Sequence, residues 1–360
     1  MLKITGISID NHTIVEGEPK GIDFSTMNAI SSCPFRGILS TYLCKRFKDG
    51  EERNMALEAG DLSHKVYAVW RALSIKDEEL QDKYVLKFLK QVVPDMPDEI
   101  FKQEVEDLIG KASECITPLS ELMVYADWIL EHSGYYDDEK DKKRTLENIR
   151  ASLMAYGSNF LTLVAEEPVW ISEDRTQVGI ELPFNVDVTI KYKENGVSCT
   201  EKFNFIGKID GIHVHKNGKL IIHENKTASR LDDSWLNQWQ TSHQITGYCF
   251  AASMFVGEIV TQARVLGMQI PIPKTSGYAF RTDRVDRETF FLENWAKWAI
   301  IQLKVLNDYK DCVEQAPMYT KSCSAYYSTC PLVCLCTINE EERKQAISEM
   351  ITKEWSPLNE

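Results

Sequence analysis

The sequence lacks any long uninterrupted apolar run, and that absence excludes one class of protein. No stretch reaches the roughly 18 consecutive apolar residues that a membrane-spanning helix requires. The first residues, MLKITGISIDNHTIVEG, also lack a basic cap followed by an apolar segment, so we expect no secretory signal peptide. The sequence therefore predicts a protein without a membrane partner and with a cytoplasmic location.

Internal repeats, low-complexity segments and the phosphate-binding motif Gly-x-x-x-x-Gly-Lys-[Ser/Thr] are likewise absent. Without that motif, any unwinding of a nucleic acid needs a separate helicase. Basic residues are outnumbered, because 41 Lys and Arg stand against 54 Asp and Glu, for a net charge of −13. This balance alone disfavours a nucleic-acid partner. Binding depends on local patches, however, and acidic metal ligands add negative charge, so the class stays open.

The 360 residues, 43% of them hydrophobic, suffice for one large domain or two to three smaller ones. Apolar spacing and capping residues predict helices over 24–48 (two short ones, with Ser25 or Thr26 as a cap and Pro34 starting the second), 51–75, 77–92, 98–112, 117–132, 139–160, 234–255, 287–314 and 338–352. β-branched and aromatic residues predict strands over 162–172, 178–192, 201–215, 219–229, 258–270 and 275–283. This order predicts an α/β fold with a mixed sheet.

Two of these strands, in GKIDGIHVHKNGKLIIHENKTAS (207–229), form a hairpin that carries charge near its apolar core. A two-residue turn at Asn217-Gly218 would direct Asp210 away from Glu224. A three-residue loop with a left-handed Gly218 would instead place Asp210 opposite Glu224, and it also gathers the apolar side chains on one face. We therefore prefer the three-residue loop. The shared face then comprises Lys208, Asp210, Ile212 and Val214 of one strand and Leu220, Ile222, Glu224 and Lys226 of the other.

Such a face has a defined chemistry. Two neighbouring carboxylates repel each other and create a site for a hard divalent cation such as Mg²⁺ or Mn²⁺. Lys226 beside them would orient or deprotonate a water, or stabilise charge on a pentavalent phosphorus. These are the parts that phosphodiester hydrolysis needs. The alternative interpretation of the same residues is a surface ion cluster.

The ten cysteines are unevenly placed. Cys44, Cys115, Cys199, Cys249 and Cys312 are scattered, and we expect them to be buried thiols. Four more lie close together in CSAYYSTCPLVCLC, and Cys33 stands near the other end, in SSCPFRG. In a cytosolic protein, such a cluster favours metal binding over disulfides.

The hairpin resembles the Gly-x-x-Asp…Glu-x-Lys-Thr signature of the PD-(D/E)XK nuclease superfamily. More narrowly, it is similar to the RecB-type group, which includes CRISPR-associated adaptation nucleases and phage exonucleases. Two further motifs match in order: Gly60-x-x-x-His64 and Gln244-x-x-x-Tyr248. The resemblance implies that His64, Asp210, Glu224 and the backbone carbonyl of Asn225 hold Mg²⁺ or Mn²⁺, with Asp210, Glu224 and Lys226 catalytic. Gln244 and Tyr248 would support the lysine and the nucleic-acid backbone.

The cysteines resemble those of the iron–sulfur members of this group. The matching residues are Cys33 before Pro34, Cys323, Cys330 before Pro331, and Cys336. This implies a [4Fe–4S] cluster that ties the chain ends together. A Cys₄ zinc site remains the alternative, because ligand identity does not separate the two. The additional Cys334 leaves the fourth ligand ambiguous, and we favour Cys336.

The resemblance implies a restriction-endonuclease-like core, in which Glu166 or Glu167 is either an acid supporting the site or a solvated strand edge. We predict four segments: 1–75 with the first cysteine and His64, 76–160 as a helical insertion, 161–285 as the core sheet, and 286–360 as the long helix and cysteine-rich region. The implied function is a DNA exonuclease acting on single-stranded or frayed ends, in a bacterial or phage-infected cytoplasm.

The pathway is not determined by the sequence, and recombination, repair, phage DNA metabolism and CRISPR adaptation all fit. A helicase or a recombination or adaptation protein is the expected partner. Two alternatives stay open: a catalytically weak nuclease-fold iron–sulfur subunit that binds DNA or a partner, and a zinc-stapled interaction protein. Cleavage polarity, endonuclease or exonuclease mode, DNA or RNA preference and oligomeric state are undetermined.

Overall fold

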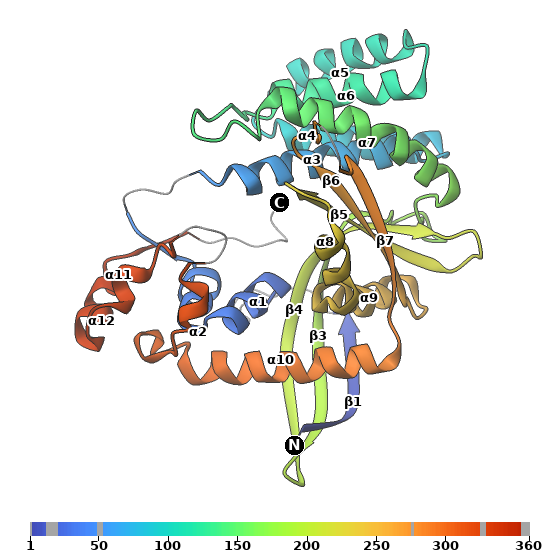
Figure 1. The fold of residues 1–360 in the computed structure, drawn as a ribbon. Helices are drawn as coiled ribbons and strands as arrows, with labels where there is room; N and C mark the ends of the chain where they lie inside the picture. Colours follow the sequence, from blue (N-terminus) through green and yellow to red (C-terminus); the bar gives the residue numbers. More distant parts are fainter. Residues whose placement is uncertain (1, 12–20, 49–52, 275–276, 325–328, 354–360) are drawn as a thin grey trace. The chain divides into compact units, whose positions relative to one another are not determined.

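The computed structural model describes residues 2–11, 21–48, 53–274, 277–324 and 329–353 (Figure 1). The first residues of the predicted helix 51–75 and of the predicted strand 275–283 lie outside these ranges. The chain divides into two compact units. One unit comprises 1–52, 183–208 and 288–360, and the other comprises 53–182 and 209–287. The four predicted segments stay a prediction.

The second unit contains a helical block, which Figure 1 shows as helices stacked side by side. Its helices are α3 (Met55–Leu73), α4 (Glu78–Val92), α5 (Asp98–Ser113), α6 (Pro118–His132) and α7 (Leu146–Glu166). Side chains of Asn54, Asp77, Thr117 and Thr145 cap α3, α4, α6 and α7 by accepting hydrogen bonds from backbone N–H groups. The predicted helices 51–75, 77–92, 98–112 and 117–132 are confirmed.

The last helix of the block differs from the prediction at both ends. It begins at Leu146 rather than at 139, because Thr145 is its cap. It continues to Glu166, so the strand predicted over 162–172 is wrong for its first half. Pro168 ends the helix, since a residue before proline avoids the helical conformation. Beyond it the chain makes only isolated bridges, Val169 with His213 and Ile171 with Val178.

A six-stranded mixed sheet follows the order β1–β3–β4–β5–β6–β7, so the predicted α/β class is confirmed at this level. Its strands are β1 (Leu2–Asn11), β3 (Ile180–Glu194), β4 (Val197–Val214), β5 (Leu220–Ala228), β6 (Gln262–Gln269) and β7 (Phe280–Asp286). β5 and β6 are parallel, whereas β4–β5 and β6–β7 are antiparallel. β1 is a strand that was not predicted from the sequence.

The β4–β5 hairpin has the predicted register. Ile212 pairs with Ile222, and the loop between the strands is closed by the N–H of Gly218, which donates to the carbonyl of His215 at 2.8 Å. Gly218 has a φ of +81°, the left-handed conformation that glycine adopts without a Cβ penalty. The three-residue loop is therefore confirmed, and continuing the register places Asp210 opposite Glu224.

The helix predicted over 234–255 is broken into three parts: α8 (Asp233–Asn237), a 3₁₀ turn (Gln238–Thr241) and α9 (His243–Val256). α9 begins anew because Ser242 caps it through its side chain. α9 packs on the Glu224 face of β5, through Gln244, and α7 packs on the Asn225 face, through Tyr156. Helices therefore cover both faces of this part of the sheet.

The first unit gathers both chain ends. Its helices are α1 (Phe24–Ser32), α2 (Pro34–Gly37), α10 (Thr289–Tyr309), α11 (Val333–Cys336) and α12 (Glu340–Ser348), with a π-helical turn at Ile38–Tyr42. Pro34 starts α2 as predicted, whereas Asp23, and not Ser25 or Thr26, caps α1. A short sheet pairs β2 (Lys45–Arg46) with β8 (Ile351–Thr352). The core of the first unit contains Phe205, whose ring contacts those of Phe184 and Trp295.

Among the described residues, no helix has both the length and the apolar character needed to cross a membrane.

Candidate active site

The hairpin brings the two predicted catalytic acids together inside the second unit. The β4–β5 ladder extends as far as the pair Gly211–His223. One step farther, the backbone N–H of Asn225 donates to Oδ2 of Asp210 at 2.7 Å. Asp210 is 6% exposed and Glu224 only 1%, so both carboxyl groups are held away from bulk water. Two buried carboxyl groups on facing strands stay ionised only if positive charge lies close to them.

His64 supplies part of that charge from α3. Its Nδ1 lies 3.4 Å from Oδ1 of Asp210 and 3.9 Å from Oε1 of Glu181. Ligand atoms of the three residues all lie within 4.8 Å of one another, the arrangement of a candidate cation site. His64 is therefore beside Asp210, where the Gly-x-x-x-His resemblance implies it should be. Gly60 faces the same hairpin, because a Cβ at this position would stand 3.4 Å from Oγ1 of Thr227.

Glu181 is a site residue that the sequence analysis missed. It sits near the start of β3 with a φ of +45°, a left-handed conformation that costs free energy for a residue with a side chain. The available signal was the same as at Glu224, an acid inside an apolar strand run, Val-Gly-Ile-Glu-Leu. Glu181 lies outside every motif that the resemblance covers, so it escaped notice.

The pKa values of Asp210 and Glu224 are shifted in opposite directions. Burial opposes ionisation of Asp210, but the adjacent charge of His64 outweighs it and holds the pKa of Asp210 well below its usual range. Burial alone would lower the pKa of His64, yet the charge of Asp210 raises it to about 10. Burial and the charge of Asp210 together raise the pKa of Glu224 to about 7. Asp210 therefore stays ionised, whereas Glu224 gains or loses its proton near neutral pH.

Lys226 points its ammonium at Glu224. Its Nζ lies 2.7 Å from Oε1 of Glu224, and the side chain is 26% exposed. Burial lowers the pKa of Lys226, but the charges of Glu224 and Asp210 outweigh it, so the pKa is raised. The Trp239 ring lies 5.9 Å from the same Nζ. The ammonium therefore stays charged at the edge of the acid pair and within reach of solvent.

The Gln-x-x-x-Tyr pair lies on α9 and reaches the site through Glu224. Nε2 of Gln244 donates to Oε1 of Glu224 at 3.0 Å and to the hydroxyl of Tyr248 at 3.3 Å. Gln244 thus contacts the partner of Lys226 rather than Lys226 itself. Oε2 of Glu224 is buried and has no hydrogen-bond partner among the described residues. An orphaned carboxylate oxygen of this kind is costly unless a donor or a cation binds it.

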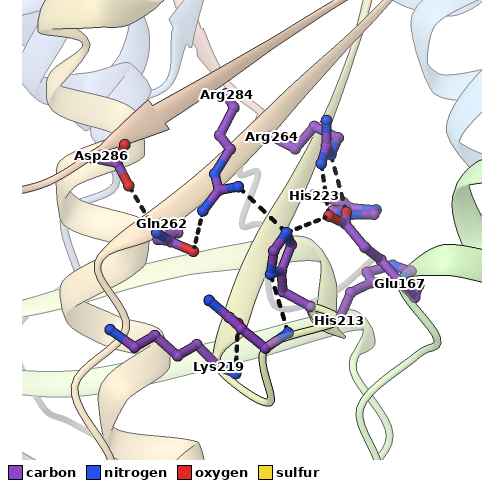
Figure 2. A network of polar contacts seen from close by, with 10 residues as sticks. Glu167, His213, Lys219, His223, Gln262, Arg264, Arg284 and Asp286 are labelled. Carbon is purple, nitrogen blue, oxygen red and sulfur yellow. Dashed lines mark hydrogen bonds and ion pairs between the residues drawn. The ribbon is translucent and has the colours of Figure 1, made fainter.

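Behind the site, a polar network ties α7 to the sheet (Figure 2). Glu167, which caps α7, accepts from Arg264 through both carboxylate oxygens, at 2.6 and 3.0 Å, and lies 2.6 Å from Nε2 of His223. Burial opposes ionisation of Glu167, but His223 and Arg264 lower its pKa to about 2. Glu166 or Glu167 was predicted to be either an acid supporting the site or a solvated strand edge. Glu167 is instead buried, and its carboxylate contacts His223 and Arg264 rather than Asp210 or Glu224.

Four of the ten cysteines converge in the first unit. Burial and the charges of Cys33, Cys323 and Cys330 raise the pKa of Cys336, so each of these three thiols lies close enough to Cys336 to act on it electrostatically. Backbone contacts hold their segments together: the N–H of Cys330 donates to the carbonyl of Cys323 at 2.8 Å. Cys334 is exposed, and its thiol donates a hydrogen bond to the carbonyl of Pro331 at 3.9 Å. Cys33 is buried beside the helix that Pro34 begins.

The chain matches no protein-family model and no curated protein. Among solved structures, one titled "Crystal structure of SSO0001" is similar over 64% of this chain and 80% of its own, with 14% sequence identity and a TM-score of 0.30. A likeness of that degree carries no inference about fold or function. The side chains of the site are therefore the basis for assigning a function.

Proposed function

We propose that the protein is a divalent-cation-dependent nuclease that hydrolyses phosphodiester bonds in DNA, acting as an exonuclease on single-stranded or frayed ends. The observation that carries the proposal is that His64, Glu181 and Asp210 form one group of candidate ligands, with Glu224 and Lys226 paired beside Asp210 in the same unit. Imidazole and carboxylate groups can bind the cation that phosphodiester hydrolysis uses, and a neighbouring ammonium can stabilise negative charge on the phosphate. Mg²⁺ and Mn²⁺ prefer such oxygen-rich sets.

The residues fit a cation by a further criterion. Oε2 of Glu224 is buried without a donor, and burial with Asp210 raises the pKa of Glu224 to about 7. A divalent cation would satisfy that oxygen and favour the ionised form. His64, Asp210 and Glu181 supply three ligand atoms within 4.8 Å, and the backbone carbonyl of Asn225 is the remaining ligand that the resemblance implies.

The chemistry divides between the cation and the lysine. A bound cation would polarise the phosphodiester and lower the pKa of a water at the site. Lys226, charged and partly exposed beside Glu224, orients the attacking water and offsets negative charge that develops on the phosphate. Gln244 holds Oε1 of Glu224, the oxygen that Lys226 shares, so the ammonium keeps a fixed place.

One half-buried tryptophan ring near Lys226 supports a preference for single-stranded substrates. The half-buried Trp239 ring lies 5.9 Å from the Lys226 ammonium and packs edge-on against Trp235, with ring centroids 5.7 Å apart. Unpaired bases stack on such rings, a contact worth roughly 1–3 kcal/mol per base. Paired bases have no free face for it, so frayed or single-stranded ends are the preferred substrate.

The four converging cysteines support a [4Fe–4S] cluster as a structural cofactor. Four thiolates on one zinc ion, each about 2.3 Å from the metal, would stand about 3.8 Å apart. In the described part of the chain, no three cysteine sulfurs lie within 4.8 Å of one another. The preference for a [4Fe–4S] cluster over a Cys₄ zinc site rests on the resemblance of the cysteine pattern to that of the iron–sulfur nucleases. Cys33, Cys323, Cys330 and Cys336 are its ligands in this proposal, with Cys334 outside the set.

The test is a cleavage assay on 5′- and 3′-labelled DNA, single- and double-stranded, with free and blocked ends, in Mn²⁺ and in chelator. We expect cation-dependent cleavage that requires a free end. Lys226→Ala and Asp210→Ala should lower the rate by about 100-fold or more, because each removes a group that acts on the transition state. Lys219→Ala is the matched control, since Lys219 is exposed on the same hairpin.

Intact DNA after incubation with wild-type protein and Mn²⁺ would contradict the proposal, as would cleavage that Lys226→Ala leaves unchanged. If DNA binds without being cut, the protein is instead a nuclease-fold iron–sulfur subunit. Cleavage of circular single strands would keep the chemistry but replace the exonuclease by an endonuclease.

A further inference from the structure

Arg71 is a fully buried charge next to the candidate active site. It lies on α3 seven residues after His64, so the two side chains project from the same side of the helix. Its relative exposure is 0%. Its charge is one of those that hold the pKa of the nearby Asp210 below its usual range. A buried guanidinium is retained at considerable cost unless its hydrogen bonds and charge are used.

Its hydrogen bonds go to the residue between Glu224 and Lys226. With the amide oriented to satisfy both of its ends, Oδ1 of Asn225 accepts from both terminal nitrogens of Arg71, at 2.7 and 3.0 Å. Nδ2 of Asn225 then donates to the hydroxyl of Tyr156 at 3.2 Å. The opposite orientation would turn the amide N–H groups toward guanidinium donors, which is unfavourable. Asn225 is thus held from both sides by α3 and α7.

A third contact fixes the guanidinium itself. Nε of Arg71 donates to Nε2 of His213 at 3.3 Å, and His213 uses Nδ1 for the carbonyl of Glu167 at 2.8 Å. Burial and neighbouring charges lower the pKa of His213 well below its usual value, so the ring is neutral and accepts. Gly211 makes room, because a Cβ there would stand 2.9 Å from Nε of Arg71.

The backbone of Asn225 links this grip to the acids. Its N–H donates to Oδ2 of Asp210 at 2.7 Å, and its neighbours in the chain are Glu224 and Lys226. Fixing the Asn225 side chain therefore fixes the peptide groups that aim Asp210, Glu224 and Lys226. Rotation of that peptide would move all three at once, a misplacement to which metal sites and catalytic groups are sensitive.

We infer that Arg71 is a positioning residue for the proposed nuclease site: by gripping the side chain of Asn225, it fixes the Glu224–Asn225–Lys226 backbone and the orientation of Asp210. The inference rests on the proposed function. It assigns to Arg71 no contact with cation or substrate. A purely structural arginine in the same unit offers the contrast, because Arg264 pairs with Glu167 in the network of Figure 2 and touches none of the acids.

The experiment compares Arg71→Met with Arg264→Met in the full-length protein. Mn²⁺ affinity is measured by calorimetry and by the electron paramagnetic resonance spectrum of bound Mn²⁺, and melting temperature is recorded for each variant. Both substitutions remove a guanidinium that holds a polar network, fully buried in Arg71 and 19% exposed in Arg264, so both should lower the melting temperature. We expect only Arg71→Met to weaken Mn²⁺ binding, by about tenfold or more, and to lower kcat with little change in KM for DNA.

Asn225→Ala removes the same contact without altering α3, and it decides the matter if Arg71→Met does not fold. It should weaken Mn²⁺ binding as much as Arg71→Met does, and the double variant should lose no more than either one. Arg71→Lys retains the charge but not the paired hydrogen bonds, and it should not restore affinity.

Equal Mn²⁺ affinity in Arg71→Met, Asn225→Ala and wild type would overturn the inference, and so would full restoration by Arg71→Lys. An equal loss in Arg264→Met would reduce Arg71 to a structural residue. These failures leave wild-type Mn²⁺ binding and cleavage intact. Absence of Mn²⁺ binding by wild type is a different result, which overturns the proposed function together with the inference.

Discussion

At the scale of single residues, the site is a set of compensated charges. Asp210 is held ionised by His64, whereas Glu224 is pushed toward protonation by burial and by Asp210. The sequence identified these residues because acids and a lysine at the end of an apolar strand are unusual. Glu181 was not identified because it lies outside the motifs of the resemblance, and Arg71 was not identified because it acquires its role from Asn225, far away in the chain.

Glu181 provides the first prediction. Glu181→Gln should weaken Mn²⁺ binding by roughly tenfold, because it removes a charged oxygen from the set with His64 and Asp210 while preserving side-chain volume. Isothermal titration with Mn²⁺ measures the change. Glu173→Gln, an exposed acid shortly before the strand, is the control and should bind as wild type does. Unchanged affinity in Glu181→Gln would remove this residue from the ligand set.

Glu167 provides a prediction about pH. Its pKa is near 4.5 in an unfolded chain and about 2 in the folded protein. A lowered folded-state pKa means that this group stabilises the fold fully above about pH 4.5, and that its contribution is lost as pH falls from there toward 2. Glu167→Gln should therefore flatten the dependence of melting temperature on pH in that window.

The neighbouring Glu166 is the matched control for this experiment, because it is exposed. Glu166→Gln should leave the pH dependence of the melting temperature as in wild type. If Glu167→Gln retains the full acid loss of stability, the ion pairs with His223 and Arg264 do not determine it.

At the scale of elements, the α3–α6 helices followed from apolar spacing and from capping residues, which are local properties. The prediction was wrong where the residue types are compatible with both a helix and a strand. Residues 162–166 include the β-branched Thr162 and Val164, yet they complete α7, a helix that packs against α3 through contacts of Tyr156 with Tyr67 and Trp70. The strand β1 was missed because its pairing partner, β3, lies about half the chain away.

The hairpin loop allows a test in which one kind of substitution has opposite effects. Gly218→Ala should lower the free energy of unfolding by about 1 kcal/mol, because a left-handed residue with a Cβ is strained. Gly110→Ala, in the exposed interior of α5, should leave the protein equally stable or up to about 1 kcal/mol more stable. Urea unfolding gives both values. Similar changes at the two positions would show that backbone conformation does not determine the effect at the loop.

At the scale of the whole chain, residues from both ends meet in one unit. Cys33 and Cys336 are brought within electrostatic range although nearly the entire chain separates them. A bond network of that span restricts the unfolded chain strongly, since the entropy of closing a loop grows with its length. We therefore expect the proposed metal centre to stabilise the first unit.

Cys336→Ser and Cys334→Ser test which thiol completes the centre. Cys336→Ser should lose broad visible absorption, bound iron and sulfide, and should melt at a lower temperature. Cys334→Ser should retain all of these, because its sulfur is exposed and directed at the carbonyl of Pro331. The reverse outcome would assign the fourth ligand to Cys334. A colourless wild-type protein containing zinc would replace the cluster by a Cys₄ zinc site.

The sequence by itself determined the elements whose signals are local: capped helices, the hairpin with its three-residue loop, and therefore the shared face of Asp210, Glu224 and Lys226. Alternation of side chains along a strand fixes that face once the register is known. Only the tertiary structure decided that Glu181 joins His64, that Arg71 grips Asn225, and that Glu167 is buried among histidines and an arginine. Those contacts depend on how distant elements pack, and no short-range pattern encodes them.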